Sequence, residues 1–564
     1  MHKRIVLNVL VLFLILGLLG CGSNPPAAST TAATTAAATT AATTVAAATT
    51  EATTAANEPE AKEIKEMTMY VNLTWWSPEW SSGEITNRYT AAEELTGLKI
   101  NFTSAAGANT ADEKLNAMLA ANDLPDLLLN ERNHASFFSM PLTGKLLGIT
   151  ALLDQYYPEG RELLPDSHFN FWKQDDGELY AWMNFFWAQE QLTKENYITS
   201  NAGFAARGDL MEELGVTKDD FIRPDDFYNT LLKVKEANLQ VEGGTVIPFA
   251  YTWNMFSDGY GVNLEGPDGH LRVTQKDPKT LEWLLFLNML WNEGLMYPDQ
   301  FTINEDVMRE LLTQGRLFCA MFNHANIINR VITNYHNEGL PYTLVPLEVP
   351  GSSDGSRGNM ESIGSAGWLG ASVTTNCSDP ELAIKFIAWS HTQEGQILMN
   401  RGIEGVEWEW VDGKLVVDQE IAMFKDENPD EGKRLYGDSF SIGYETALWQ
   451  RIGALPVTPG SITANEFSQF SQKYAFDELA IWNTRPTANT DEAVIETSVN
   501  EIWSMYVPQI ITATSQAEAT RIYDQAIAEL DAAGIEDLIA FRDTLFQKNK
   551  DKLGIDFYYP SNKK

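Results

Sequence analysis

The chain has 564 residues and a formal net charge of −37, with 77 Asp and Glu against 40 Lys and Arg. This charge repels a phosphate backbone and argues against nucleic acid as a partner. The length exceeds that of one compact domain, so we expect two or more lobes. The few cysteines indicate neither a disulfide framework nor a metal cluster, and Cys319 and Cys377 could form a disulfide or remain two buried thiols.

The beginning of the chain has the pattern of an export signal. Two basic residues precede an apolar run over residues 5–20, which is shorter than the roughly 20 residues of a membrane-spanning helix. Leu-Leu-Gly-Cys at 18–21 resembles the bacterial lipobox, in which the cysteine is lipidated and becomes the first mature residue. We expect a lipoprotein signal peptide over 1–20 and a lipid anchor at Cys21. The alternative is an ordinary secretory signal with an incidental cysteine.

The segment after Cys21 is typical of a tether. Residues 22–50 are almost entirely Ala, Thr, Ser and Pro, without a charged residue, and such a composition cannot build a core. A flexible coil of this length has an end-to-end distance of about 30 to 35 Å. We expect residues 21–60 to form a disordered stalk that holds the folded part clear of the lipid headgroups.

The first folded segment alternates strands and helices. Hydrophobic patterns predict strands over 67–76, 98–103 and 124–129, a helix over 89–96, and a second helix that begins at a capping box formed by Thr110 and Glu113. This order predicts a parallel sheet, which binds ligands at the carboxyl ends of its strands. Trp75, Trp76 and Glu131 occupy two of those ends.

The middle of the chain is again predicted to alternate between the two kinds of element. We expect a strand that passes into a short helix over 205–215, then a helix over 224–238 and a strand over 247–251. A helix that Asp277 caps should follow and end near Gly294, and a further strand is expected over 342–349. The loops between them are expected to carry Trp253, Phe322 and His324.

The last third is predicted to be mainly helical. An extended piece over 364–374 precedes a helix that opens at Asp379-Pro380, and Asp412-Gly413 is typical of a hairpin turn. A capping box of Ser515 and Glu518 begins a helix that ends at Gly534, and a final helix follows.

Several motifs, in this order along the chain, resemble the extracellular solute-binding lipoproteins of bacterial ABC importers. They are Ala-Arg-Gly-Asp-Leu at 206–210, Leu-Trp-Asn-Glu-Gly-Leu-Met-Tyr-Pro-Asp at 290–299, Arg-Gly-Ile-Glu-Gly-Val-Glu-Trp at 401–408, and the helical pair at 516–543. They are similar to family 1, the carbohydrate type, and within it to the LplA-like subfamily of Gram-positive bacteria. The resemblance implies a two-lobed α/β fold of the periplasmic-binding-protein type II, with hinge strands between the lobes and a helical C-terminal region.

The resemblance also implies domain boundaries. Lobe 1 is expected to contain residues 65–187 plus about 366–405, and lobe 2 residues 188–365. Residues 406–564 would pack across both lobes.

Many relatives in this subfamily carry a calcium loop after the helix that corresponds to 224–238. Calcium needs six to eight oxygen ligands, whereas residues 238–248 contain a single carboxylate. We therefore expect no metal in this loop, and no cofactor.

Aromatic rings suit sugars because the pyranose C–H faces are apolar, while carboxylates, amides and guanidinium groups can bind the hydroxyls. Any one tryptophan could equally belong to a core. The ligand-binding residues predicted from strand ends, loops and motifs are Trp75, Trp76, Glu131, Trp182, Trp187, Arg207, Trp253, Asn254, Phe322, His324, Trp368 and Glu404. Asp209 and Asn323 are further polar candidates, and a surface or structural role is the alternative for Asp209 and Glu404.

The resemblance implies a monomeric solute-binding protein that captures an oligosaccharide and delivers it to the permease subunits of an ABC importer. It would be exported and held on the outer face of the cytoplasmic membrane by its lipid anchor alone. A lipid-anchored glycoside hydrolase, or a peptide-binding or adhesive lipoprotein, are the alternatives. The sequence contains no His-Glu-x-x-His, Walker or dinucleotide motif, and the Gly- and Ser-rich turn at 351–358 does not stand between a strand and a helix, so we expect no enzyme. Nutrient sensing is the alternative to import.

Overall fold

The structure is a computed structural model, and it describes residues 63–556 except 81–86, 109, 187–199, 253, 256–258, 359, 362–365, 440–441, 454–456, 473–474, 477–478 and 488–489. The expected signal peptide, the lipidation site Cys21, the whole stalk, and the candidates Trp187 and Trp253 lie outside these described residues.

The first sheet has the strand order β2-β1-β3-β13-β4, and β5 also pairs with β13. Its strands are β1 (Lys65–Val71), β2 (Leu98–Ser104), β3 (Leu127–Glu131), β4 (Leu146–Leu147), β5 (Trp182–Met183) and β13 (Leu369–Thr374). β1 is parallel to β2 and β3, as predicted, whereas β13 is antiparallel to β3. The first strand ends five residues earlier than predicted, because Val71 pairs with the last residue of β2 and the ladder stops there.

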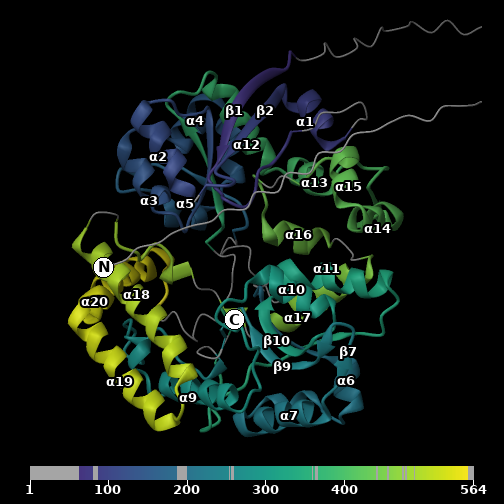
Figure 1. The fold of residues 1–564 in the computed structure, drawn as a ribbon. Coiled ribbons are helices and arrows are strands. Elements are labelled where there is room, and N and C mark those ends of the chain that lie inside the picture. Colours follow the sequence, from purple (N-terminus) through teal and green to yellow (C-terminus); the bar gives the residue numbers. More distant parts are fainter. Residues whose placement is uncertain are drawn as a thin grey trace, which may run out of the picture. The chain divides into compact units, whose positions relative to one another are not determined.

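Helices connect and cover this sheet. They are α1 (Arg88–Thr96), α2 (Ala111–Ala121), α3 (Ala135–Ser139), α4 (Ile149–Tyr156), α5 (Asp166–Trp172) and α12 (Pro380–Ser390), and most of them surround β1 and β2 in Figure 1. The side chain of Asn87 caps α1 by accepting from the backbone N–H groups of Tyr89 and Thr90. The capping box predicted for α2 is wrong, because the Thr110 side chain makes no capping hydrogen bond.

The second sheet has the order β11-β6-β10-β9. Its strands are β6 (Ala202–Arg207), β9 (Ile247–Tyr251), β10 (Leu317–Asn323) and β11 (Leu344–Leu347), and its helices are α6 (Gly208–Glu213), α7 (Pro224–Ala237), α9 (Pro278–Asn292), α10 (Glu305–Thr313) and α11 (His324–Asn337). The predicted cap of α9 is confirmed, since the Asp277 side chain accepts from the Lys279 N–H. Each sheet has its own core, with Phe204, Phe227 and Phe249 in the second and Met69, Leu127 and Ile384 in the first.

The segment after α7, in which the resemblance places a calcium loop, folds as a tight hairpin. Asn238 ends α7 in the left-handed conformation, with φ of 45°, and β7 (Gln240–Val241) pairs with β8 (Gly244–Thr245). The amide of Gln240 donates to the Thr245 hydroxyl at 3.1 Å. Among the described residues, no group of three or more His, Cys, Asp and Glu side chains is placed to hold a metal.

The C-terminal third is helical, as predicted. Its helices are α13 (Gln393–Arg401), α14 (Gln419–Glu427), α15 (Pro429–Tyr436), α16 (Thr446–Ile452), α17 (Pro459–Ser471), α18 (Asp491–Thr512), α19 (Gln516–Ala533) and α20 (Ile535–Leu553). A hairpin of β14 (Trp408–Val411) and β15 (Lys414–Val417) follows α13. A short ladder joins β12 (Met360–Glu361) to β16 (Ala475–Phe476). Asp412 and Gly413 have φ of 50° and 75°, which a two-residue hairpin turn requires. The hairpin prediction is confirmed.

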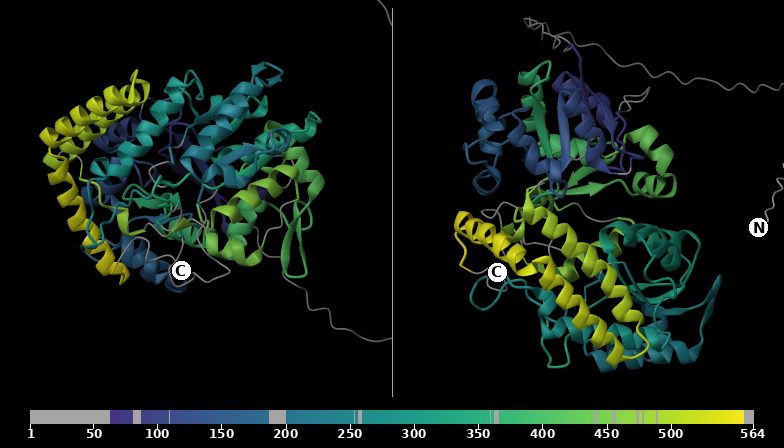
Figure 2. Two further views of the ribbon diagram at one scale, coloured as in Figure 1. Left: turned by 90° about the horizontal axis from the view of Figure 1, so that it is seen from below. Right: turned by 60° about the vertical axis from the view of Figure 1, so that its left-hand side comes forward.

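The last three helices, yellow in Figures 1 and 2, contact α9 beside the second sheet and α5 beside the first. The Asn288 amide of α9 donates to the carbonyl of Ala513 at 2.7 Å, just beyond α18, while the Lys552 ammonium of α20 donates to the carbonyl of Phe171 in α5 at 3.3 Å. The Ser515 hydroxyl caps α19, but the Glu518 carboxylate bonds to Thr514, so only half of the predicted capping box forms. Among the described helices, none is both long enough and apolar enough to cross a membrane.

Cys319 lies in β10 and Cys377 follows β13, and both are free thiols. Cys319 is buried and Cys377 half-buried. Burial raises the pKa of each thiol, so both are poor nucleophiles near neutral pH.

Candidate ligand-binding site

An exposed indole lies beyond the carboxyl end of β1. Trp75 is 68% exposed, and its ring stacks on that of Trp368 with centroids 5.9 Å apart and planes 11° apart. The Trp76 ring also lies against the Trp75 ring, with centroids 6.5 Å apart and planes 30° apart. A tryptophan so exposed contributes little to a core, and large exposed aromatic rings are typical of binding sites.

Glu131, the last residue of β3, places a carboxylate beside these rings. The Trp368 Nε1–H donates to its Oε1 at 2.9 Å, and the His134 Nε2 lies 3.3 Å from its Oε2. The two contacts fix the orientation of the carboxylate, and its remaining lone pairs can accept hydrogen bonds from hydroxyl groups. The parallel strands of the first sheet thus bring an apolar face and a polar acceptor together, as predicted from the strand ends.

The rings continue as a row toward the C-terminal region. Phe185 lies edge-on to Trp368 at 5.9 Å and stacks on Tyr444 at 4.2 Å, and Tyr444 stacks on Trp449 at 5.2 Å. We call Trp76, Trp75, Trp368, Phe185, Tyr444 and Trp449 the aromatic row. It runs from Trp76 and the exposed Trp75 to a buried end at Trp449, which is 6% exposed.

The backbone at Phe185 is strained. Its φ is 51°, a conformation that a bulky side chain adopts at a cost of about 1 to 3 kcal/mol. The Phe185 N–H donates to the Tyr444 carbonyl at 2.6 Å, and the neighbouring Asn184 side chain accepts from the Leu369 N–H at 2.8 Å. These bonds to two other segments hold the strained residue in place and fix the ring within the row.

Four of the predicted ligand-binding residues meet at this site, namely Trp75, Trp76, Glu131 and Trp368. Asn254 is half-buried and Glu404 is exposed in the turn after α13, and neither has a described contact with the aromatic row.

The predicted loop positions of Phe322 and His324 are wrong. Phe322 lies inside β10 and is fully buried. His324 begins α11, is 1% exposed, and its Nε2 lies 2.7 Å from the Ser200 carbonyl. All seven residues of β10 are buried between β6 and β9, so the strand lacks the alternating pattern by which strands are usually recognised.

Trp182 and Arg207 are also core residues in this structure. Trp182 is fully buried and stacks on His391 at 4.2 Å. Arg207 is 1% exposed, pairs with Asp209, and donates to the Gly315 carbonyl at 2.6 Å. Neither side chain presents a surface to solvent here.

The sequence interpretation omitted Phe185, Tyr444 and Trp449. The run Phe185-Phe186-Trp187 carried a signal, since three consecutive aromatic residues cannot all face one core. Tyr444 and Trp449 carried none, because their place in the row depends on a C-terminal segment that returns to the first sheet.

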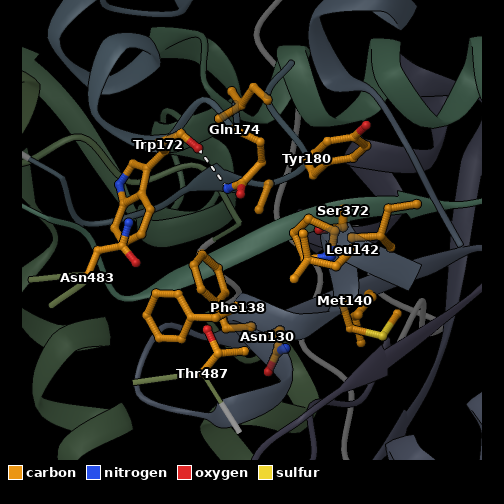
Figure 3. Close-up of a pocket in the computed structure, with 16 residues that line it drawn as sticks. Asn130, Phe138, Met140, Leu142, Trp172, Gln174, Tyr180, Ser372, Asn483 and Thr487 are labelled. Carbon is orange, nitrogen blue, oxygen red and sulfur yellow. Dashed lines mark hydrogen bonds between the residues drawn. The ribbon is translucent and has the colours of Figure 1, made fainter. Parts of the chain in front are cut away.

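A separate pocket of about 160 Å³ lies against the same sheet (Figure 3). Leu128, Asn130 and Ser372 of β3 and β13 line one side, and Trp172, Phe138 and Asn483 are among the residues of the other. The Asn130 amide is already engaged, because it donates to the Ser136 hydroxyl at 2.9 Å and accepts from the Asn72 amide at 2.9 Å. No charged residue lines this pocket, so it suits only a small neutral group.

Comparison with known proteins gives the context of this site. A family model described as bacterial extracellular solute-binding protein matches residues 78–397. The lipoprotein LipO of Bacillus subtilis (strain 168) is 21% identical over 343 residues, which cover 57% of this chain and 64% of LipO, less than two thirds of that relative.

Solved structures show the same fold at low identity. The substrate-binding protein FusA of the S. pneumoniae ABC transporter, in complex with kestose, has a TM-score of 0.65 and 16% identity, with 86% of this chain and all of that chain covered. The alginate-binding protein AlgQ2 without calcium ion has a TM-score of 0.64 and 16% identity, with 86% and 98% covered. The predicted two-lobed α/β fold with a helical C-terminal region is confirmed. Since the family model spans more than half of the sequence, the chain belongs to the bacterial extracellular solute-binding proteins.

Proposed function

We propose that this protein captures an oligosaccharide on the aromatic row and delivers it to the permease subunits of an ABC importer, as a monomer of the LplA-like subfamily. The observation that carries the proposal is the exposed Trp75 indole, stacked on Trp368 beside the Glu131 carboxylate. An exposed ring face binds the apolar face of a pyranose, and the carboxylate accepts from its hydroxyls.

The known proteins of the same fold support this proposal. The FusA structure contains kestose and AlgQ2 is described as alginate-binding, so two-lobed proteins of this kind bind carbohydrates. Neither structure is described as peptide-binding, so the peptide-binding alternative has no comparable support.

For this function we divide the chain into two lobes and a C-terminal region. Lobe 1 contains residues 65–187 and about 366–405, and lobe 2 contains residues 188–365. The C-terminal region contains residues 406–564. The pairing of β13 with β3 supports the return to lobe 1. The contacts of α18 and α19 with α9, and of α20 with α5, support a C-terminal region that packs on both lobes.

Ligand should be bound and released unchanged, because a binding protein is complementary to the ground state of its ligand. We expect at least one glycan of an oligosaccharide library to raise the melting temperature of the purified protein. Overnight incubation with that glycan should produce no new reducing ends. Steady release of reducing ends by micromolar protein would instead support the hydrolase, and stabilisation by peptides alone would support the peptide-binding alternative.

We further propose that Cys21 anchors the protein to the outer face of the membrane. The Leu-Leu-Gly-Cys motif and the similarity to a lipoprotein support this location. Cys21→Ala should release the protein from washed membranes or block its processing. Stable retention needs two or three acyl chains, and Cys21 would carry all of them. Immunoblots of membrane and medium fractions measure the outcome, with Cys377→Ala as the control that keeps the anchor. A processed Cys21→Ala protein that stays on the membrane would contradict the proposal.

A further inference from the structure

A larger pocket, of about 520 Å³, lies among α1, α11, α13, α14, α15 and α17. Four cationic side chains line it, namely Arg88, Arg401, Lys425 and Lys433, against the two carboxylates Asp426 and Asp438. We call it the cationic pocket. The chain as a whole has a net charge of −37, whereas more cations than carboxylates line this pocket.

A third carboxylate, Glu407, neutralises only part of this charge. Its side chain is 2% exposed, pairs with the Arg88 guanidinium at 3.0 Å, and also pairs with the Lys425 ammonium. Arg88 is fixed further by donating to the carbonyls of Met399 at 2.9 Å and Tyr436 at 3.0 Å. One carboxylate thus serves two cations, and Arg88 has a structural role at the base of the pocket.

Of the two carboxylates that line the pocket, one balances a lysine and the other offsets little of the remaining charge. Asp438 lies 3.4 Å from the Lys433 ammonium, so this pair is internally balanced. Burial raises the pKa of Asp426, so at a given pH it carries less negative charge than an exposed aspartate.

Arg401 is the cation whose charge no carboxylate offsets. It lies in the last turn of α13, and its guanidinium lies 4.8 Å from the centre of the Trp449 ring. Its Nη1 donates to the carbonyl of its neighbour Asn400 at 3.3 Å, and no carboxylate in the described part of the chain forms an ion pair with it. Burial lowers the pKa of the Lys425 ammonium, and the charges of Arg88 and Arg401 lower it further against the opposing effect of Glu407.

Arg401 joins the cationic pocket to the aromatic row, because the ring on which it lies, Trp449, is the buried end of that row. We propose that the cationic pocket receives an acidic group of the glycan, a uronate carboxylate or a sulfate ester, and that the protein therefore prefers acidic oligosaccharides. A guanidinium binds such a planar or tetrahedral anion through two parallel N–H donors, and the Lys425 ammonium adds a point charge. This inference rests on the proposed function and adds the chemical class of the ligand.

The test compares each acidic oligosaccharide with its uncharged counterpart. Trigalacturonate, trimannuronate and a sulfated trisaccharide are titrated calorimetrically into the full-length protein, beside the methyl esters of the two uronates and the unsulfated trisaccharide. At least one acid should bind at least tenfold more tightly than its counterpart, and 0.3 M salt should reduce this ratio, because the added attraction is between charges.

Arg401→Gln should bring the ratio of the acid and counterpart affinities close to one, and Arg401→Lys should restore part of it. Arg434→Gln is the matched control, because Arg434 lies on α15, pairs with Glu431 and does not line the pocket, so this variant should keep the wild-type ratio. Circular dichroism and melting curves confirm that each variant is folded.

Equal affinity for acids and their counterparts would overturn the inference and leave the proposed function intact. So would an Arg401-dependent stabilisation by inorganic sulfate without any preference among the oligosaccharides, since the pocket would then bind a free anion. Absence of binding in both series would overturn the inference, whereas the proposed function is decided separately by the oligosaccharide library.

Discussion

Trp75→Ala should weaken oligosaccharide binding by about tenfold to a hundredfold. Covering one face of an indole contributes about 1.5 to 3 kcal/mol by the usual apolar-area estimate, which corresponds to that range of affinities. Because the side chain is 68% exposed, its removal should leave the melting temperature of the free protein almost unchanged. Calorimetric titration with a glycan found in the library screen measures the effect.

Two further variants separate the role of the row from that of exposed aromatic surface in general. Trp410→Ala removes an indole that is 38% exposed on β14, outside the row, and should bind with wild-type affinity. Trp368→Phe keeps a ring beneath Trp75 but loses the donor to Glu131, so we expect a smaller loss than for Trp75→Ala. Wild-type affinity in both Trp75→Ala and Trp368→Phe would place the sugar elsewhere.

Glu407→Leu should cost about 3 to 5 kcal/mol of folding free energy, because it leaves the buried Arg88 charge without its counter-ion. The Arg88 side chain is 3% exposed and the Glu407 side chain 2%, so water cannot replace the lost partner. The substitution also removes the acceptor for the Ile403 N–H, which now bonds to Glu407 at 3.0 Å. Urea unfolding followed by tryptophan fluorescence measures the change.

The pair itself can be tested by removing both charges. Arg88→Met combined with Glu407→Leu should be destabilised less than the sum of the single variants, since neither charge is then left unpaired. Glu431→Leu, which breaks the exposed pair with Arg434 on α15, is the surface control and should leave the unfolding curve almost unchanged. Additive effects of the two core substitutions would contradict the coupling.

The Glu407 carboxylate explains why the motif that begins at Arg401 contains a glycine at its second position. In Arg-Gly-Ile-Glu-Gly, Gly402 has φ of 86°, and any side chain there would overlap the Glu407 carboxylate. The glycine is therefore required by conformation and by close packing. The motif forms part of the wall behind the cationic pocket, whereas Glu404, the residue of the motif selected as a ligand-binding candidate, is exposed in the turn.

The sequence alone predicted the features that depend on neighbours along the chain. The parallel strands around β1, the cap of α9 at Asp277 and the hairpin at Asp412-Gly413 follow from local hydrophobic periodicity and turn chemistry. The meeting of Trp75 and Glu131 followed as well, because the carboxyl ends of parallel strands share one edge of the sheet.

Only the tertiary structure decided which aromatic and charged residues reach solvent. Trp75 and Trp182 look alike in sequence, yet one is 68% exposed and the other fully buried, because burial depends on which distant segments pack against a residue. Phe185 and Tyr444 meet only because a C-terminal segment returns beside Phe186, just after β5. The cationic pocket likewise needs Arg88 and Arg401 from segments more than 300 positions apart, a distance over which no local pattern carries information.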